Sequence, residues 1–431
     1  MKIVLDPSPL QRKELLQRPA IDATALQATV RKVLMDVKEN GDEALQRYTQ
    51  QFDGVIPAIV AVQEEEIREA IALLPAGLKQ AIQQAASNIR VFHEKQVQAP
   101  EIVETMPGVQ CWRRSIGIEK VGLYIPGGTA PLFSTILMLG IPAAIAGCKE
   151  IILCSPPNKE GKLHPAIVFA AYLVGITKMY KVGGVQAIAA MAYGTPSIPQ
   201  VYKIFGPGNQ YVTCAKQLIQ QEGIAIDMPA GPSEVCVLAD ESANAVFVAA
   251  DLLSQAEHGA DSQVLLVSTS AGVVEQVQSA LDAQLALLPR KEIAALALEN
   301  SKAIIVKDME EAIALVNEYA AEHLIISCKE EDAIAGKIVN AGSIFLGNYS
   351  PESVGDYASG TNHTLPTNGF AKAYSGVSVD SFVKKITYQK LSKEGLQQIG
   401  KTVELMAAAE GLDAHKNAVS IRLAAIERNE L

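Results

Sequence analysis

The sequence contains 431 residues, of which 49% are apolar and 5% are aromatic. A chain of this length is expected to form about two or three domains. A core built mainly from Ala, Leu, Ile and Val favours α/β layers over a β-sandwich. The formal net charge of −10 argues against nucleic acid as a partner, because an acidic surface repels phosphate groups.

The cysteines and the apolar segments indicate a cytoplasmic protein. None of the six cysteines forms a CxxC pair, which is typical of free thiols in a reducing compartment. The N-terminal apolar run is too short for a signal peptide. The most apolar stretch, residues 134–147, is interrupted by Gly140 and Pro142 and is too short to span a bilayer. We therefore predict no membrane partner.

The pattern of the chain changes near residue 118. Residues 1–24 are polar and contain three prolines, which indicates an arm. Residues 25–98 carry apolar residues at helical spacing. Between 118 and 221, short apolar strands alternate four times with helices, usually across a turn with Gly or Pro. This alternation predicts a parallel, doubly wound sheet, whose ligands are expected at the carboxyl ends of its strands.

A second set of apolar strands follows, and most of its members are separated by helical segments. These strands are predicted at 233–240, 262–269, 302–308, 322–327 and 342–347. They indicate a second α/β sheet of similar size. From about residue 380 the pattern is helical again, up to the end of the sequence.

Histidine is both a frequent metal ligand and a frequent general base, so the six histidines can be considered singly. His93 lies on a charged helix and His164 in a polar loop, and we predict that both are surface residues without a role. The other four lie at element boundaries or in loops of the second half: His258, His323, His363 and His415. Any one of them alone is better explained as a structural histidine, whereas four together in the second half favour a functional site.

The stretch SQAEHG closes a predicted amphipathic helix that opens at Ser242 or Asp240 and ends at Gly259. Gln255 and His258 are three residues apart and therefore share a helical face. Together with Asp356, which lies in a turn-rich segment, they offer donors that suit a divalent cation such as zinc. The spacing alone is weak support, because HExxH and a cysteine cluster are absent.

Glu322 and His323 open a predicted strand. Adjacent strand residues point to opposite faces, but a bend at the strand entrance would let both reach one cavity as proton-transfer groups. The alternative is a surface glutamate beside a structural histidine. The turns PGG, VGG and GPGN contain no GxGxxG, so the usual dinucleotide-binding fingerprint is absent and these turns are also explained as tight βα connections.

Several longer stretches resemble the histidinol dehydrogenase family over essentially the whole chain. They are VGLYIPGGTAPLFSTILML, IFGPGNQYVT, AIDMPAGPSE, DLLSQAEHGADSQV, AEHLII, SPESVGDYASGTNHTLPTNG and AEGLDAHKNAVS. The resemblance implies a homodimeric enzyme that requires zinc and NAD. It also implies oxidation of L-histidinol to L-histidinal and then to L-histidine, the last steps of histidine biosynthesis.

The resemblance implies specific roles for residues of this sequence. The metal ligands would be Gln255, His258, Asp356 and His415, the last contributed by the partner subunit. The catalytic pair would be Glu322 and His323. The substrate would contact Ser233, His363 and Glu410, as well as His323 and the four metal ligands. The NAD contacts would be Tyr124, Gln186 and Asn209.

The expected fold has two doubly wound, incomplete Rossmann-like domains, with a C-terminal helical segment exchanged across the dimer. We divide the chain into an arm at 1–24, a first α/β domain at 25–117 plus 234–378, a second at 118–233 that contacts NAD, and a dimerisation segment at 379–431.

The mechanistic hypothesis gives His323 the role of general base and lets Glu322 activate water for the aldehyde step. A rival second step forms a thiohemiacetal on cysteine, for which Cys154 is best placed, followed by Cys111 and Cys236. Two other functions stay open. One is a family relative that oxidises another polar alcohol, such as a sulfonated diol, and the other is a metal-stabilised dimer without activity.

Overall fold

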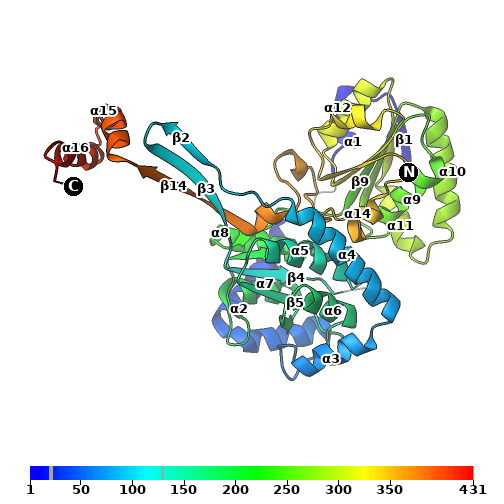
Figure 1. Ribbon diagram of the computed structural model, residues 1–431. Helices are drawn as coiled ribbons and strands as arrows, with labels where there is room; N and C mark the ends of the chain where they lie inside the picture. The colour runs from blue at the N-terminus through cyan, green and yellow to red at the C-terminus, as the bar shows by residue number, and fades with distance from the viewer. Residues whose placement is uncertain (19–22, 128–130, 431) are drawn as a thin grey trace. The chain divides into compact units, whose positions relative to one another are not determined.

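The computed structural model describes residues 1–18, 23–127 and 131–430 (Figure 1). Contacts divide the chain into a larger unit, residues 1–96 and 118–382, and a smaller unit, residues 97–117 and 383–431. The larger unit contains two parallel sheets, as the two predicted sets of strands require. None of the helices in the described ranges is long and apolar enough to cross a membrane.

One sheet of the larger unit has six parallel strands in the order β1-β11-β10-β9-β12-β13. The strands are β1 (Lys2–Leu5), β9 (Glu234–Ala239), β10 (Gln263–Ser268), β11 (Lys302–Ile305), β12 (His323–Ser327) and β13 (Ser343–Leu346). All residues of β9, β10 and β12 are buried, as expected for parallel strands that are covered on both faces. The predicted arm instead begins with β1, which pairs with β11.

Helices connect and cover these six strands. They are α1 (Pro9–Leu15), α9 (Ala245–Ala256), α10 (Ala271–Leu285), α11 (Lys291–Glu299), α12 (Met309–Tyr319), α13 (Glu331–Ala335) and α14 (Glu352–Tyr357). One apolar cluster joins the sheet to residues of α9, α10 and α11, and a second joins it to α12. Two 3-10 turns, Phe370–Lys372 and Val379–Phe382, follow in the chain.

The other sheet has five parallel strands in the order β6-β5-β4-β7-β8. The strands are β4 (Lys120–Tyr124), β5 (Glu150–Ser155), β6 (Lys178–Lys181), β7 (Lys203–Phe205) and β8 (Ala225–Ile226). The helices α5 (Phe133–Ile145), α6 (Pro165–Leu173), α7 (Gly184–Tyr193) and α8 (Gln210–Gln221) alternate with them. The four predicted strand–helix pairs are thus confirmed, and the two-residue β8 is an addition.

The helices that precede this sheet in sequence also pack beside it (Figure 1). They are α2 (Ala23–Asp53), which has a kink at Gly41, α3 (Glu64–Leu73) and α4 (Ala76–Glu94). They contact α7, α6 and α5 respectively. The sequence-based division grouped residues 25–117 with the later strands, whereas Val30, Leu34 and Leu45 of α2 share a core with Ile188 of α7. Helical periodicity identifies the apolar face of a helix but not the face it covers.

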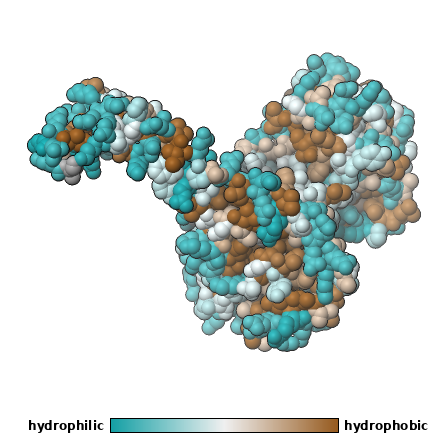
Figure 2. All heavy atoms as spheres, in the orientation of Figure 1, coloured by the Kyte–Doolittle hydropathy of each residue, from teal (hydrophilic) through white to brown (hydrophobic). Residues whose placement is uncertain are grey.

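The smaller unit is an antiparallel sheet followed by two helices. The sheet order is β14-β3-β2, with β2 (Ile102–Met106), β3 (Val109–Gly117) and β14 (Val383–Leu391). The prediction of helix from about residue 380 is wrong for β14, whose β-branched and aromatic residues pair with β3. Helices α15 (Lys393–Ala409) and α16 (Asp413–Glu427) pack on each other. Figure 2 shows hydrophobic residues among the hydrophilic ones on this unit, and Leu405, Met406, Leu412 and Ile421 are exposed.

Candidate active site

Two adjacent residues with titratable side chains lie at the amino end of β12, in the six-stranded sheet. Tyr319 ends α12, Ala320 has a left-handed φ of 54°, and Glu322 and His323 follow. Glu322 is 6% exposed and His323 is 3% exposed. The reversal at Ala320 turns the chain from helix into strand within three residues. From the sequence, ligands of a parallel sheet are expected at the carboxyl ends of its strands. In the six-stranded sheet, this pair lies instead at the amino end of a strand.

The side chains of Glu322 and His323 lie close to each other, as a bend at the strand entrance would allow. Their closest approach, between Glu322 Oε2 and His323 Nδ1, is 3.7 Å. His323 Nε2 lies 3.3 Å from Asp356 Oδ1, an atom of α14. The main chain of Glu234, at the start of β9, donates its N–H to Glu322 Oε2 at 2.9 Å. An imidazole thus lies between two carboxylates.

The pKa values of these groups shift for opposing reasons. Burial raises the pKa of Glu322, and the neighbouring His323 only partly opposes this. Burial alone would lower the pKa of His323, but the carboxylates of Glu322 and Asp356 outweigh it and raise that pKa. Burial would raise the pKa of Asp356, and its interaction with His323 reverses the direction. The three groups thus form one buried, electrostatically coupled cluster, which is the kind of arrangement that general acid–base chemistry uses.

Gln255 and His258 lie at the end of α9. The α9 N-cap is Asn244, whose side chain accepts from Val246 and Phe247, rather than the predicted Ser242 or Asp240. Gln255 is in the last turn and 1% exposed, and its Nε2 donates to Glu322 Oε2 at 3.4 Å. His258 is an exposed residue in the turn that follows.

The donors in this region fit a divalent cation. Gln255 Oε1 is buried and accepts no hydrogen bond from the part of the chain that the structure describes, and the buried Asp356 Oδ1 lies 3.3 Å from His323 Nε2. Buried oxygen atoms of this kind ordinarily have a partner, and a cation would provide one. Across residues 1–18, 23–127 and 131–430, no group of three His, Cys, Asp or Glu residues is arranged around a metal position. Of the four predicted ligands, Gln255 is not one of these residue types and His415 belongs to the smaller unit. His258 and Asp356 are therefore the two that such a group in the larger unit could contain.

The remaining predicted substrate contacts are distributed over both units. His363 Nδ1 lies 2.7 Å from the Asp356 carbonyl, and its Nε2 lies 3.0 Å from Thr135 Oγ1 of α5. Ser233 immediately precedes β9. Glu410 caps the carboxyl end of α15 and His415 lies in α16, so both belong to the smaller unit, where both are exposed.

Sequence reasoning missed Glu352, which is 1% exposed in α14. Its Oε1 accepts a hydrogen bond from Ser254 at 2.6 Å, whereas its Oε2 has no partner within the described ranges. Burial raises the pKa of Glu352 to about 7. Its place in the turn-rich segment that also holds Asp356 was the only available signal.

A second candidate region is a cavity of about 780 Å³ at the carboxyl ends of β4, β5, β6 and β7. It is lined by all three predicted NAD contacts, Tyr124, Gln186 and Asn209. The Tyr124 hydroxyl accepts from the Gly184 N–H at 3.1 Å, and Asn209 caps α8. Gln186 is fully buried, and neither of its amide atoms has a partner among the described residues. The cavity thus lies at the carboxyl strand ends, where the sequence predicts the ligand of this sheet.

The structure also locates the other histidines and the cysteines that were considered in the sequence analysis. The prediction that His93 is a surface residue is wrong, because it is fully buried and its Nδ1 lies 2.8 Å from the Ile89 carbonyl. His164 is exposed, caps α6 and lines the cavity. Cys154 and Cys236 are fully buried, and burial raises the pKa of both thiols. Cys111 lies in β3 of the smaller unit.

Comparison with known proteins gives a consistent result. The family model described as histidinol dehydrogenase matches residues 16–423. A histidinol dehydrogenase of Bacteroides thetaiotaomicron is 60% identical over 423 residues, which cover 98% of this chain and 99% of that protein. One from Shewanella oneidensis is 52% identical over 429 residues, with 97% of each chain covered.

A solved structure agrees with the sequence matches. The crystal structure of histidinol dehydrogenase from Elizabethkingia anophelis superposes with a TM-score of 0.97 at 55% sequence identity, and 99% of each chain is covered. Since the family model and these relatives span nearly the whole chain, the chain belongs to the histidinol dehydrogenase family of oxidoreductases.

Proposed function

We propose that the chain oxidises L-histidinol by way of L-histidinal to L-histidine, with NAD+ as the hydride acceptor in both steps. The observation that carries the proposal is the buried Glu322–His323 pair beside the unpartnered oxygen of Gln255 and the carboxylate of Asp356. Two oxidations at one carbon need a base for the alcohol and a way to activate water for the aldehyde. A buried carboxylate and imidazole in contact can supply both.

We further propose that Gln255, His258 and Asp356 hold a zinc ion, with His415 of the partner subunit as a fourth ligand. Amide oxygen, carboxylate and imidazole are all donors that zinc accepts. When bound, the ion would supply positive charge and orientation for the substrate's imidazole and amine.

The proton steps are assigned to atoms of this chain. His323 Nε2 lies 3.3 Å from Asp356 Oδ1, whereas Nδ1 lies near the Glu234 carbonyl and Glu322. His323 would take the alcohol proton at Nε2 as hydride leaves in the first oxidation. Glu322 would take a proton from water as it adds to the aldehyde, and His323 would assist the second oxidation. The rival route through Cys154 finds no support, because that thiol is fully buried and its pKa is raised.

The NAD+ is assigned to the cavity at the carboxyl ends of the five-stranded sheet. Tyr124, Gln186 and Asn209 would contact it, and the unpartnered Gln186 amide offers both a donor and an acceptor. Ser233, His363 and Glu410 would contact the substrate, together with His323 and the proposed metal ligands.

The active form is proposed to be a homodimer in which the smaller unit completes the partner's site. Its helices α15 and α16 expose large apolar residues, which a partner would cover. Complementation tests this. The variants His323→Gln and His415→Ala, each expected to be inactive alone, should regain about a quarter of the parent activity when they are unfolded and refolded together, if sites are shared. No recovery would refute the exchange.

The test of the whole proposal is the NADH released per L-histidinol consumed, measured before and after chelation and zinc return. Two NADH per substrate, lost on chelation and restored by zinc, is the expected result. Zinc should also raise the melting temperature of the chelated protein, which is independent of turnover. One NADH with free aldehyde would refute the role of Glu322. NADH from a different polar alcohol alone would favour the alternative substrate.

A further inference from the structure

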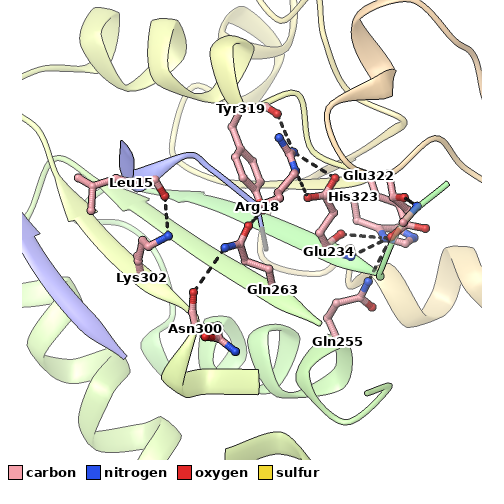
Figure 3. A network of polar contacts seen from close by, with 12 residues as sticks. Leu15, Arg18, Glu234, Gln255, Gln263, Asn300, Lys302, Tyr319, Glu322 and His323 are labelled. Carbon is pink, nitrogen blue, oxygen red and sulfur yellow. Dashed lines mark hydrogen bonds and ion pairs between the residues drawn. The ribbon is translucent and has the colours of Figure 1, made fainter. Parts of the chain in front are cut away.

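A largely buried ion pair lies beside the Glu322–His323 pair (Figure 3). Arg18 Nε donates to Glu234 Oε2 at 2.7 Å, and Arg18 Nη2 donates to Glu234 Oε1 at 3.1 Å. The side chains are 15% and 3% exposed, respectively. Two parallel charge-assisted bonds in a buried place hold the Glu234 carboxylate in one geometry.

The main chain of Glu234 contacts both members of the pair. Its N–H donates to Glu322 Oε2 at 2.9 Å, and its carbonyl oxygen lies 3.4 Å from His323 Nδ1. Glu322 Oε2 also accepts from Gln255, at 3.4 Å. A displacement of residue 234 would therefore move the carboxylate and the imidazole together.

Arg18 also joins the two backbone segments that carry these groups. Its Nη2 donates to the Tyr319 carbonyl at 2.8 Å, and its guanidinium lies 4.2 Å from the centre of the Tyr319 ring. Tyr319 ends α12, three residues before Glu322. The Tyr319 hydroxyl donates to Gln263, the β10 residue that pairs with Glu234. One guanidinium thus connects the start of β9 to the chain that enters β12.

We propose that Arg18 and Glu234 are positioning residues, which hold Glu322 and His323 in their reactive arrangement without touching substrate. The kinetic side of this inference rests on the proposed function. Arg18 belongs to the segment that the sequence indicates to be an arm, so the inference gives that segment a part in catalysis.

The test uses two variants and a matched control in the full chain. Arg18→Lys keeps the charge but loses the two parallel bonds. The double variant Arg18→Met, Glu234→Gln removes both charges, so that no uncompensated buried charge is left to unfold the protein. Arg12→Lys is the control, because Arg12 also lies in the N-terminal segment and pairs with Glu311, with side chains 15% and 14% exposed.

The first readout is kinetic. In folded Arg18 variants we expect kcat with L-histidinol to fall by about tenfold to a hundredfold, because a misplacement of about 1 Å costs this much. The KM for L-histidinol should change far less than kcat, since the residues proposed to bind it are unaltered. Arg12→Lys should keep the parent kcat. A folded Arg18 variant with kcat within about twofold of the parent overturns the inference.

The second readout does not depend on activity. The imidazole resonance of His323 can be assigned in protein labelled at histidine Cε1 by its loss in His323→Gln. It should move in both Arg18 variants and stay in place in Arg12→Lys. An unmoved resonance overturns the inference. If the parent makes no NADH from L-histidinol, the proposed function fails, while this resonance still decides whether Arg18 positions His323.

Discussion

Replacing Glu322 by Gln tests the division of labour within the catalytic pair. A Gln side chain has the same length, and its carbonyl oxygen can accept the Glu234 N–H that now bonds Glu322 Oε2 at 2.9 Å. Burial raises the pKa of Glu322 because it penalises the charged carboxylate, so a neutral amide of the same shape should not lower the melting temperature. The effect should therefore be chemical rather than structural.

The expected loss lies in the aldehyde step. Without a carboxylate to take a proton from water, that step should slow by about 10²- to 10⁴-fold, which is about 3–5 kcal/mol of barrier. The alcohol step should slow by less than about tenfold, because its proposed base, His323, is retained. The assay follows NADH from L-histidinol and from L-histidinal separately, with hydroxylamine to capture free aldehyde.

The comparison of the two substrates decides the result. We expect the NADH yield from L-histidinol to fall from two towards one, with captured aldehyde making up the difference. The control His323→Gln should slow both oxidations. Equal losses in the two steps of Glu322→Gln would refute the assignment of water activation to Glu322, and a large drop in melting temperature would refute the structural part of the reasoning.

Three further predictions concern a thiol, a buried carboxyl group and a tight turn. Cys154→Ala should keep two NADH per L-histidinol, because that thiol is fully buried and burial raises its pKa; loss of the aldehyde step alone would revive the cysteine route. Burial raises the pKa of Asp251 from 3.8 to about 7. The native state therefore keeps a proton that the unfolded chain loses near pH 4. The free energy of unfolding consequently falls as the pH rises from 4 to 7. Asp251→Asn should therefore raise the melting temperature above pH 7 and have little effect at pH 4, and a shift independent of pH would contradict this. Gly206 has a φ of 128°, and a Cβ there would lie 2.0 Å from the Tyr124 carbonyl oxygen, so Gly206→Ala should cost about 1–3 kcal/mol in urea unfolding and raise the KM for NAD+. Gly223 is the control: its φ is 97°, but a Cβ there would have no atom within 4 Å. Gly223→Ala should therefore lower stability and leave the KM for NAD+ unchanged.

Local sequence signals determined much of the fold. Short apolar runs predicted the strands of both parallel sheets except β1 and β8, because a strand covered on both faces must be apolar throughout. Pro165 and Asn209 mark the starts of α6 and α8, where each residue suits the unpaired N–H groups of a helix start. The resemblance, carried by contiguous stretches, gave the residues of the candidate site.

Only the tertiary structure decided how distant segments meet. Residues 383–391 read as helix but form β14, because pairing with β3 overrides local preference. Nothing near His93 in the sequence distinguishes it from a surface histidine, although it is fully buried. Arg18 reads as one charge in a polar arm, yet it reaches Glu234 and Tyr319, more than 200 residues away. Such contacts depend on how whole elements pack, and the free energy of a buried ion pair is set by surroundings that the local sequence does not contain.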